Sequence, residues 1–280
     1  MDGLSLVIPA LNEEQGLPRV LDMLKSLQAS LSIPLEVIVV DDGSSDGTAQ
    51  VAQGQAATVI RHPLRLGYGA SLKDGIRKAR YTWIGIIDAD GSYDATELGR
   101  LLDCAGRYDM VIGARQGKLY QGGWVKSPMR KVFQWLCTYA TGVRVPDINS
   151  GFRVFRKDLV LGQLGLLSQG FSFTTSLTMF YLLEGHVVGS VPVRYTDRLG
   201  RSKVRGLRDT LRTAQILVEM IFLYNPLKAF LILGLIPLAL GVLTIRWQPA
   251  GGGIMLSMAC LIWSLGGLGV ALSRRNRLHT

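Results

Sequence analysis

The stretch WIGIIDAD, residues 83–90, is an apolar run that ends in two carboxylates, Asp88 and Asp90. A short run rich in isoleucine is typical of a strand buried on both faces of a parallel sheet. Two carboxylates at the end of such a strand repel each other and lose hydration. A divalent cation bridging a diphosphate would relieve both costs, because Mg²⁺ prefers one or two carboxylates together with substrate phosphates. A D-x-D triplet also occurs on ordinary surfaces, where Asp90 would cap a helix or turn, but its place after a strand favours a phosphate and metal site.

The first half of the chain repeats this arrangement of a strand followed by polar residues. Further apolar runs predict strands at residues 4–11, 35–42, 57–61 and 110–114. Helical patterns lie between the strands, at residues 14–30, 46–53, 69–80 and 96–105. This alternation predicts an α/β fold that is Rossmann-like, with a doubly wound and mostly parallel sheet. Ligands bind beyond the carboxyl ends of the strands in such sheets. The polar clusters fall at those ends: Asn12-Glu13-Glu14, Asp41-Asp42, Asp88-Ala89-Asp90 and Arg115.

Length and charge narrow the class of protein. The 280 residues suffice for one α/β domain of about 200 residues with an appendage. A formal net charge of +10 requires an anionic partner, which is nucleic acid, a lipid surface or a phosphorylated substrate. Nucleic acid is not expected, because the basic residues gather beside apolar segments. No signal peptide is predicted at the N-terminus. Neither the cysteines nor the histidines show metal-binding, redox or triad spacing: Cys104, Cys137, Cys260, His62, His186 and His279.

Two long apolar segments close the chain, at residues 227–245 and 252–272. Each has about 20 residues, enough to cross roughly 30 Å of hydrocarbon. A short turn at residues 246–251 joins them, so they predict a two-helix transmembrane hairpin rather than two buried core helices. Pro237 lies inside the first segment, where a kink is tolerated in a membrane.

The basic residues orient this hairpin. Seven lysines and arginines lie between Arg194 and Arg212, and the tail adds Arg274, Arg275 and Arg277, whereas the turn has only Arg246. The positive-inside rule therefore predicts a multi-pass protein of the cell (inner) membrane, with both termini and the α/β domain in the cytoplasm.

A basic amphipathic segment precedes the hairpin at residues 124–143. Aromatic and aliphatic residues recur at helical spacing, with Lys126, Arg130 and Lys131 between them. This pattern predicts an interfacial helix, with an ordinary core-facing helix as the alternative. The expected organisation is a catalytic domain at residues 1–210, a juxtamembrane helix at 211–225, two transmembrane helices at 226–273 and a basic tail at 274–280.

Four motifs resemble, in order, those of family 2 glycosyltransferases. They are VIPALNEE at residues 7–14, VVDDGSSDGT at 39–48, DADGS at 88–92 and GAR at 113–115. Their order and spacing are similar to the polyprenyl-phosphate mannose and glucose synthase branch, from about residue 4 to residue 205. The resemblance implies a GT-A fold, a nucleotide-sugar donor of the GDP-mannose or UDP-glucose type, and Mg²⁺ or Mn²⁺ as cofactor.

The resemblance also assigns roles to residues. Asp88 and Asp90 are the expected metal ligands and, with Arg115, the expected catalytic residues. Ser92 stands where some dolichyl-phosphate mannose synthases have glutamine, so its part in the metal site stays open. The expected donor-nucleotide-binding residues are Pro9, Ala10, Leu11, Glu13, Asp41, Asp42, Asp88, Ala89 and Asp90.

Two downstream segments resemble further blocks of this branch. DINSGFR at residues 147–153 resembles its S-G-F-R block, and RLGRSK at 198–203 resembles its R-x-x-G-x-S-K block with one residue fewer. The resemblance implies that arginines and lysines from these segments bind phosphates, a geometry that guanidinium groups suit. The alternative for the basic run is a membrane anchor only. The expected ligands of the acceptor phosphate are Arg115, Arg130, Arg198 and Lys203.

The chemistry follows from the acceptor. A polyprenyl monophosphate is largely dianionic at pH 7 and is already a nucleophile, so no general base is required. A single in-line displacement would invert the anomeric carbon.

The alternative functions agree less well with the sequence. A processive polysaccharide synthase is not favoured, because the Q-x-x-R-W block is missing. The intact Asp42, Asp88, Asp90 and Arg115 argue against a degenerate membrane scaffold. The sequence leaves open another lipid or glycan acceptor, the donor, the polyprenyl length and whether the chain is a homo-oligomer.

Overall fold

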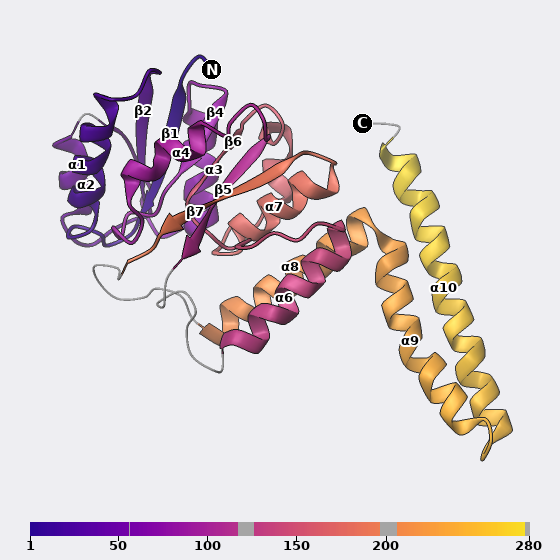
Figure 1. The fold of residues 1–280 in the computed structure, drawn as a ribbon. Helices are drawn as coiled ribbons and strands as arrows, with labels where there is room; N and C mark the ends of the chain where they lie inside the picture. The colour runs from indigo at the N-terminus through magenta and orange to yellow at the C-terminus, as the bar shows by residue number, and fades with distance from the viewer. Residues whose placement is uncertain (56, 117–125, 197–205, 278–280) are drawn as a thin grey trace. The chain divides into compact units, whose positions relative to one another are not determined.

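A computed structural model describes the 280-residue chain except for residues 56, 117–125, 197–205 and 278–280. The side chains of residues 126–133, 206–211, 213 and 273–277 are also outside the description. The chain divides into two compact units, Met1–Thr213 and Ala214–Thr280 (Figure 1).

The first unit is built on a seven-stranded sheet with the order β3-β2-β1-β4-β6-β5-β7. Strand β6 is antiparallel to both of its neighbours, and the other pairs are parallel. The strands are β1 (Leu4–Ala10), β2 (Leu35–Asp41), β3 (Thr58–Arg61), β4 (Trp83–Ile86), β5 (Met110–Gln116), β6 (Arg153–Arg156) and β7 (Val188–Arg194). The predicted mostly parallel Rossmann-like sheet is confirmed.

Helices connect the parallel strands, as the sequence pattern predicted. Helix α1 buries one apolar face formed by Leu17, Val20, Leu21, Leu24 and Leu27. The elements are α1 (Leu17–Gln28), α2 (Thr48–Gln53), α3 (Tyr68–Lys78), η1 (Ala95–Glu97), α4 (Leu98–Leu102), α6 (Lys126–Thr141), η2 (Leu161–Leu166) and α7 (Phe173–Leu183).

Strand β1 lies inside the sheet, between β2 and β4, and is buried along its whole length. Its neighbour β2 pairs with all of it, whereas β4 pairs only with Leu4 to Val7. The nitrogen of Pro9 points to the β4 side beyond the end of that ladder, so the missing N–H costs no strand pairing there. The chain order reverses at β1, between β2 and β4, and the carboxyl ends of these three strands form the topological switch point where ligands bind in such sheets.

The second unit contains the helices α9 (Pro226–Thr244) and α10 (Pro249–Arg277), which pack side by side. Trp263 Nε1 donates to the carbonyl of Leu231 at 3.3 Å, and its ring lies against Gly234, where a Cβ would clash. By length and composition both helices are candidate membrane spans, and only 22% and 11% of their most apolar windows are buried. The predicted candidate hairpin is confirmed. Helix α8 (Gly206–Tyr224) precedes it across the boundary of the two units.

Candidate functional site

The loops after β1 and β2 are held together by side chains that bind backbone groups. Ser44 Oγ accepts from the Asn12 N–H at 2.9 Å, and Asn12 Oδ1 accepts from the Ser45 N–H at the same distance. Thr48 Oγ1 accepts from the Glu13 N–H at 2.8 Å. These reciprocal bonds place the motifs at residues 7–14 and 39–48 side by side at the switch point.

The predicted donor-binding residues of β1 lie at this junction. Pro9 and Ala10 are the last two residues of β1, and the carbonyl of Ala10 accepts from the Asp42 N–H at 2.9 Å. Leu11 follows and is partly buried. The carbonyl of Glu13 accepts from the Leu17 N–H at 2.9 Å, which joins this loop to the start of α1.

Asp42 organises the loop that follows β3. Its side chain is 5% exposed and accepts from the Leu66 N–H at 2.7 Å and the Gly67 N–H at 2.9 Å. The buried His62 lies between two carboxylates, with Nδ1 2.9 Å from Asp42 and Nε2 3.2 Å from Asp74. His62 therefore connects the carboxylate of Asp42 to that of Asp74 in α3.

Asp41 is fully buried at the end of β2. Its Oδ1 accepts from the Ser44 N–H at 2.9 Å. Its Oδ2 is the buried side-chain acceptor that has no hydrogen bond within the described part of the chain. Arg61 Nε lies 3.3 Å from this oxygen, which compensates the charge without hydrogen-bond geometry. A partly satisfied buried carboxylate at a switch point is suited to an N–H donor from a ligand.

The carboxylates after β4 are held from two directions. Asp90 Oδ1 accepts from the Ser92 N–H at 3.0 Å and from Ser92 Oγ at 2.5 Å, around Gly91 with its positive φ of 69°. Asp88 Oδ1 accepts from the hydroxyl of Tyr68 at 2.9 Å. Ala89 between them presents its carbonyl to Gly16, where a Cβ would lie 2.7 Å away. Ser92 thus fixes the carboxylate of Asp90.

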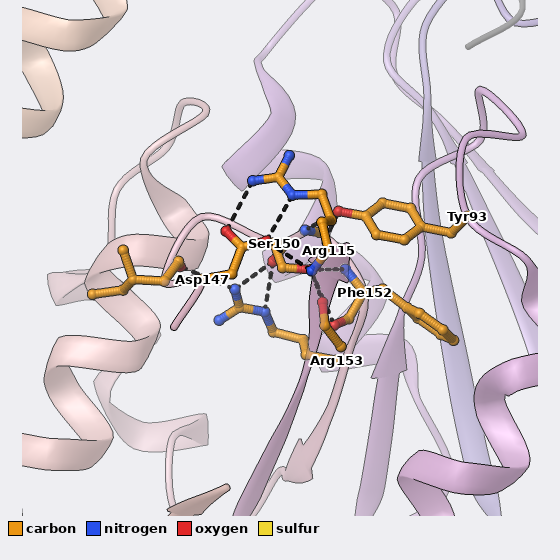
Figure 2. A network of polar contacts seen from close by, with 9 residues as sticks. Tyr93, Arg115, Asp147, Ser150, Phe152 and Arg153 are labelled. Carbon is orange, nitrogen blue, oxygen red and sulfur yellow. Dashed lines mark hydrogen bonds and ion pairs between the residues drawn. The ribbon is translucent and has the colours of Figure 1, made fainter. Parts of the chain in front are cut away.

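The block at residues 147–153 packs directly against Asp88. A Cβ on Gly151 would lie 2.3 Å from Asp88 Oδ2, so only glycine fits this position. The Gly151 N–H donates to the hydroxyl of Tyr93 at 3.0 Å, and Ser150 Oγ donates to the carbonyl of Gly113 at 2.6 Å. Figure 2 shows this network, which connects the loop after β4 to β5 and β6.

Arg115, near the end of β5, forms a bidentate ion pair with Asp147. Its Nε donates to Oδ2 at 2.7 Å and its Nη2 donates to Oδ1 at 2.9 Å. The side chain of Asp147 is 2% exposed and that of Arg115 is 19% exposed (Figure 2). The guanidinium also lies 5.3 Å from the ring centroid of Tyr195. Both contacts fix the plane of the guanidinium.

Arg153 is also part of this network but is fully buried. Its five N–H groups donate to the carbonyls of Ser150, Ile148 and Thr174 and to Thr178 Oγ1. Burial lowers the pKa of its guanidinium to about 10, so it remains charged at neutral pH. The expectation that the arginine of this block binds a phosphate is therefore wrong for Arg153, because its donors bind protein oxygens in the core.

Comparison with known proteins now identifies the family. Residues 5–162 match the model of the family described as glycosyl transferase family 2, which is more than half of the chain. The chain belongs to glycosyltransferase family 2. This glycosyltransferase is 32% identical over 219 residues to a polyprenol monophosphomannose synthase from Mycolicibacterium smegmatis, covering 72% of this chain and 80% of the relative. It is 31% identical over 219 residues to an undecaprenyl-phosphate mannosyltransferase from Micrococcus luteus, covering 71% and 86%.

Solved structures share the fold of this glycosyltransferase. Glucosyl-3-phosphoglycerate synthase from Mycobacterium tuberculosis in complex with phosphoglyceric acid has a TM-score of 0.63 at 20% identity, covering 78% of this chain and 80% of that chain. The same enzyme with Mn²⁺, uridine diphosphate and glucosyl-3-phosphoglycerate has a TM-score of 0.62 at 19% identity. The sheet is therefore the predicted GT-A fold.

The predicted acceptor-phosphate ligands other than Arg115 fall in parts of the chain that are described incompletely or not at all. Arg198 and Lys203 lie outside the described residues. Arg130 lies in α6, which agrees with the helix predicted at residues 124–143, but its side chain is not described. Within the described ranges, no group of three or more histidine, cysteine or acidic side chains could hold a metal ion. The assignment of Asp88 and Asp90 as metal ligands stays a prediction.

The structure adds residues that the motifs did not assign. Tyr68 and Tyr93 hold the loop after β4, and Asp147 orients Arg115. Asp147 belongs to the motif that resembled the family, so an acidic residue next to the S-G-F-R block was the available signal.

Proposed function

We propose that this glycosyltransferase transfers a hexose from a nucleotide sugar to the phosphate of a polyprenyl phosphate, giving a lipid-linked monosaccharide. The observation that carries the proposal is the pair Asp88 and Asp90 at the switch point, in a chain whose relatives are named for polyprenyl-phosphate mannosyl transfer. The names of those relatives favour mannose as the hexose and GDP-mannose over UDP-glucose as the donor.

The nucleotide would bind across the ends of β1 and β2. The backbone of residues 9–13 and the carboxylates of Asp41 and Asp42 line this junction. The buried Oδ2 of Asp41 lies next to the side chain of Arg61, which is 56% exposed. Asp42 already accepts from the loop after β3, so it would shape the nucleoside pocket as well as contact the ligand.

The residues present fit a divalent cation of the Mg²⁺ or Mn²⁺ type. Asp88 and Asp90 supply carboxylates, and the described residues offer no further cluster that would enclose the ion. Such an ion would take its remaining ligands from the diphosphate and water, which is the usual preference of Mg²⁺. When bound, it would neutralise charge on the leaving diphosphate. Ser92 would keep the carboxylate of Asp90 in place.

The displacement requires little from the protein besides positioning. A phosphate oxygen of the acceptor attacks the anomeric carbon, the bond from this carbon to the diphosphate breaks, and the nucleoside diphosphate leaves with the electron pair. One displacement inverts the configuration. Arg115, fixed by Asp147, would stabilise the charge that moves between the two phosphate groups. Arg130, Arg198 and Lys203 are the proposed remaining ligands of the acceptor phosphate.

The acceptor lipid requires a membrane. The candidate spans α9 and α10 would hold the enzyme in the bilayer as a multi-pass protein, and α6 and α8 would lie at its surface. The distribution of arginine and lysine supports the proposal that the catalytic domain and both termini face the cytoplasm. A reporter after Thr280 should then be cytoplasmic, and a tag near Gln248 should be accessible only from the other side. Finding both on one side would contradict the hairpin.

Product formation tests the function itself. Purified full-length protein is incubated with GDP-mannose, UDP-glucose or related nucleotide sugars, together with undecaprenyl or dolichyl phosphate and Mn²⁺. We expect a lipid-linked monosaccharide, detected by mass spectrometry, with GDP-mannose as the preferred donor. A sugar transferred only to another lipid or a glycan would move the proposal to a different acceptor. No transfer to any of these acceptors would overturn it.

A further inference from the structure

Two consecutive residues connect the carboxylates at the ends of β2 and β4. The Gly67 N–H donates to Asp42 Oδ2 at 2.9 Å, and the hydroxyl of Tyr68 donates to Asp88 Oδ1 at 2.9 Å. Gly67 has a φ of 114° and precedes α3, whose first residue is Tyr68. The start of α3 therefore contacts both carboxylate motifs of the proposed donor site.

Asp88 has little freedom between its two neighbours. Tyr68 binds Oδ1, and Gly151 lies so close to Oδ2 that a Cβ there would be 2.3 Å away. Tyr93 in turn holds the Gly151 N–H at 3.0 Å. The hydroxyl of Tyr68 therefore orients the carboxylate from one side, and close packing of Gly151 limits it on the other.

Tyr68 itself is held in place by the segment before α7. Its ring stacks on Phe171, with centroids 5.5 Å apart and an interplanar angle of 24°. The Gly69 and Ala70 N–H groups donate to the carbonyl of Gln169 at 2.8 and 3.1 Å.

We propose that Tyr68 is a positioning residue whose hydroxyl holds Asp88 in the orientation that binds the metal–diphosphate group of the donor. The inference rests on the proposed function, because it assumes that Asp88 serves this group. Hydrogen bonds to a carboxylate ligand fix its direction, and removing such a partner lowers metal affinity roughly 10- to 100-fold. The effect should appear only when metal is present.

The test is the variant Tyr68→Phe, which keeps the stacked ring and removes the hydroxyl. Binding of GDP and of UDP to the full-length protein is measured by calorimetry with and without Mn²⁺. We expect Mn²⁺-dependent nucleotide binding to weaken roughly 10- to 100-fold, and metal-free binding to change less than about twofold. The matched control is Tyr181→Phe, which removes a buried tyrosine hydroxyl that donates to the carbonyl of Arg156, outside the site. Its Mn²⁺-dependent binding should equal that of the wild type.

The outcomes separate this inference from the proposed function. If the wild type binds neither nucleotide with Mn²⁺, the proposed function fails and the role of Tyr68 fails with it. If the wild type binds and Tyr68→Phe binds equally well, only the role of Tyr68 is overturned. An equal loss of affinity with and without Mn²⁺ also overturns it, because that result indicates a general structural effect.

Discussion

In the N-terminal half of the sheet, β1 to β4, acidic, amide and hydroxyl side chains bind the backbone of neighbouring loops. In the C-terminal half, β5 to β7, two arginines bind protein oxygens instead. Asn12, Ser44 and Asp42 represent the first kind of contact. Arg115 and Arg153 represent the second. The first half fixes loop backbones around a polar junction, and the second fixes charged side chains beside it.

The two arginines show how much position matters within the second half. Arg115 is 19% exposed and paired with a carboxylate, so its charge can act on a ligand as well as on Asp147. Arg153 is fully buried, and its partners are neutral oxygens of the chain. The same residue type is therefore a proposed catalytic group at one position and a structural core residue at the other.

The largest expected effect concerns Arg153. Arg153→Met should lower the free energy of unfolding by about 3–5 kcal/mol, because several buried acceptors lose their donors. The matched control is Arg156→Met at the other end of β6, where the side chain is 40% exposed and pairs with Asp158. That change should cost less than about 1 kcal/mol. Thermal unfolding of both variants measures the difference, and equal stability would contradict a core role for Arg153.

The next largest effect concerns the loop after β4. Asp90→Asn should reduce turnover roughly 10²- to 10³-fold without unfolding the protein, because it removes charge from the proposed metal site. Asp94 offers a matched control, since its Oδ1 accepts from the Thr96 N–H at 3.0 Å in the same way as Asp90 accepts from Ser92. Asp94→Asn should keep its activity. Full wild-type activity in excess chelator would exclude metal dependence.

The N-terminal half was predictable because its signals are local. Strands β1 to β4 are apolar runs rich in valine and isoleucine, and the polar clusters follow them directly in the chain. The positions of Asp42, Asp88 and Asp90 at one edge follow from parallel pairing alone. The hydrogen bonds of the N-terminal half also join the motifs at residues 7–14 and 39–48. The residues that resemble the family are therefore also the residues that contact one another in the structure.

In the C-terminal half only β5 has such a local signal, and β6 and β7 lack it. Strand β6 has only four residues, Arg153–Arg156, and its buried arginine breaks the apolar pattern expected of a core strand. Strand β7 contains glycine and Pro192, which the position at the sheet edge tolerates. The pairing of Arg115 with Asp147 joins residues 32 positions apart, and no periodicity in the sequence reports it.

A smaller effect tests the pairing of Arg115 with Asp147. Arg115→Ala should mainly lower kcat, by about ten- to a hundredfold, because the lost charge-assisted contact is worth roughly 1.5–3 kcal/mol. Asp147→Asn should lower kcat in the same range if its function is to orient Arg115. The kcat of the double variant should then equal that of Arg115→Ala, because each single change disrupts the same Arg115–Asp147 ion pair. Additive losses in this cycle would show that the two residues act independently.

The smallest expected effect concerns Arg130, which lies in α6 and whose predicted function rests on the basic amphipathic pattern of residues 124–143. The phosphate of a polyprenyl lipid lies at headgroup depth, so a cation on an interfacial helix would bind it equally in the ground and transition states. Arg130→Ala should therefore raise the KM for polyprenyl phosphate about tenfold and leave kcat nearly unchanged. This split is the opposite of that expected for Arg115. The control is Arg144→Ala, an exposed arginine just after α6, which should change neither constant. An unchanged acceptor KM in Arg130→Ala would transfer the acceptor role to Arg198 and Lys203.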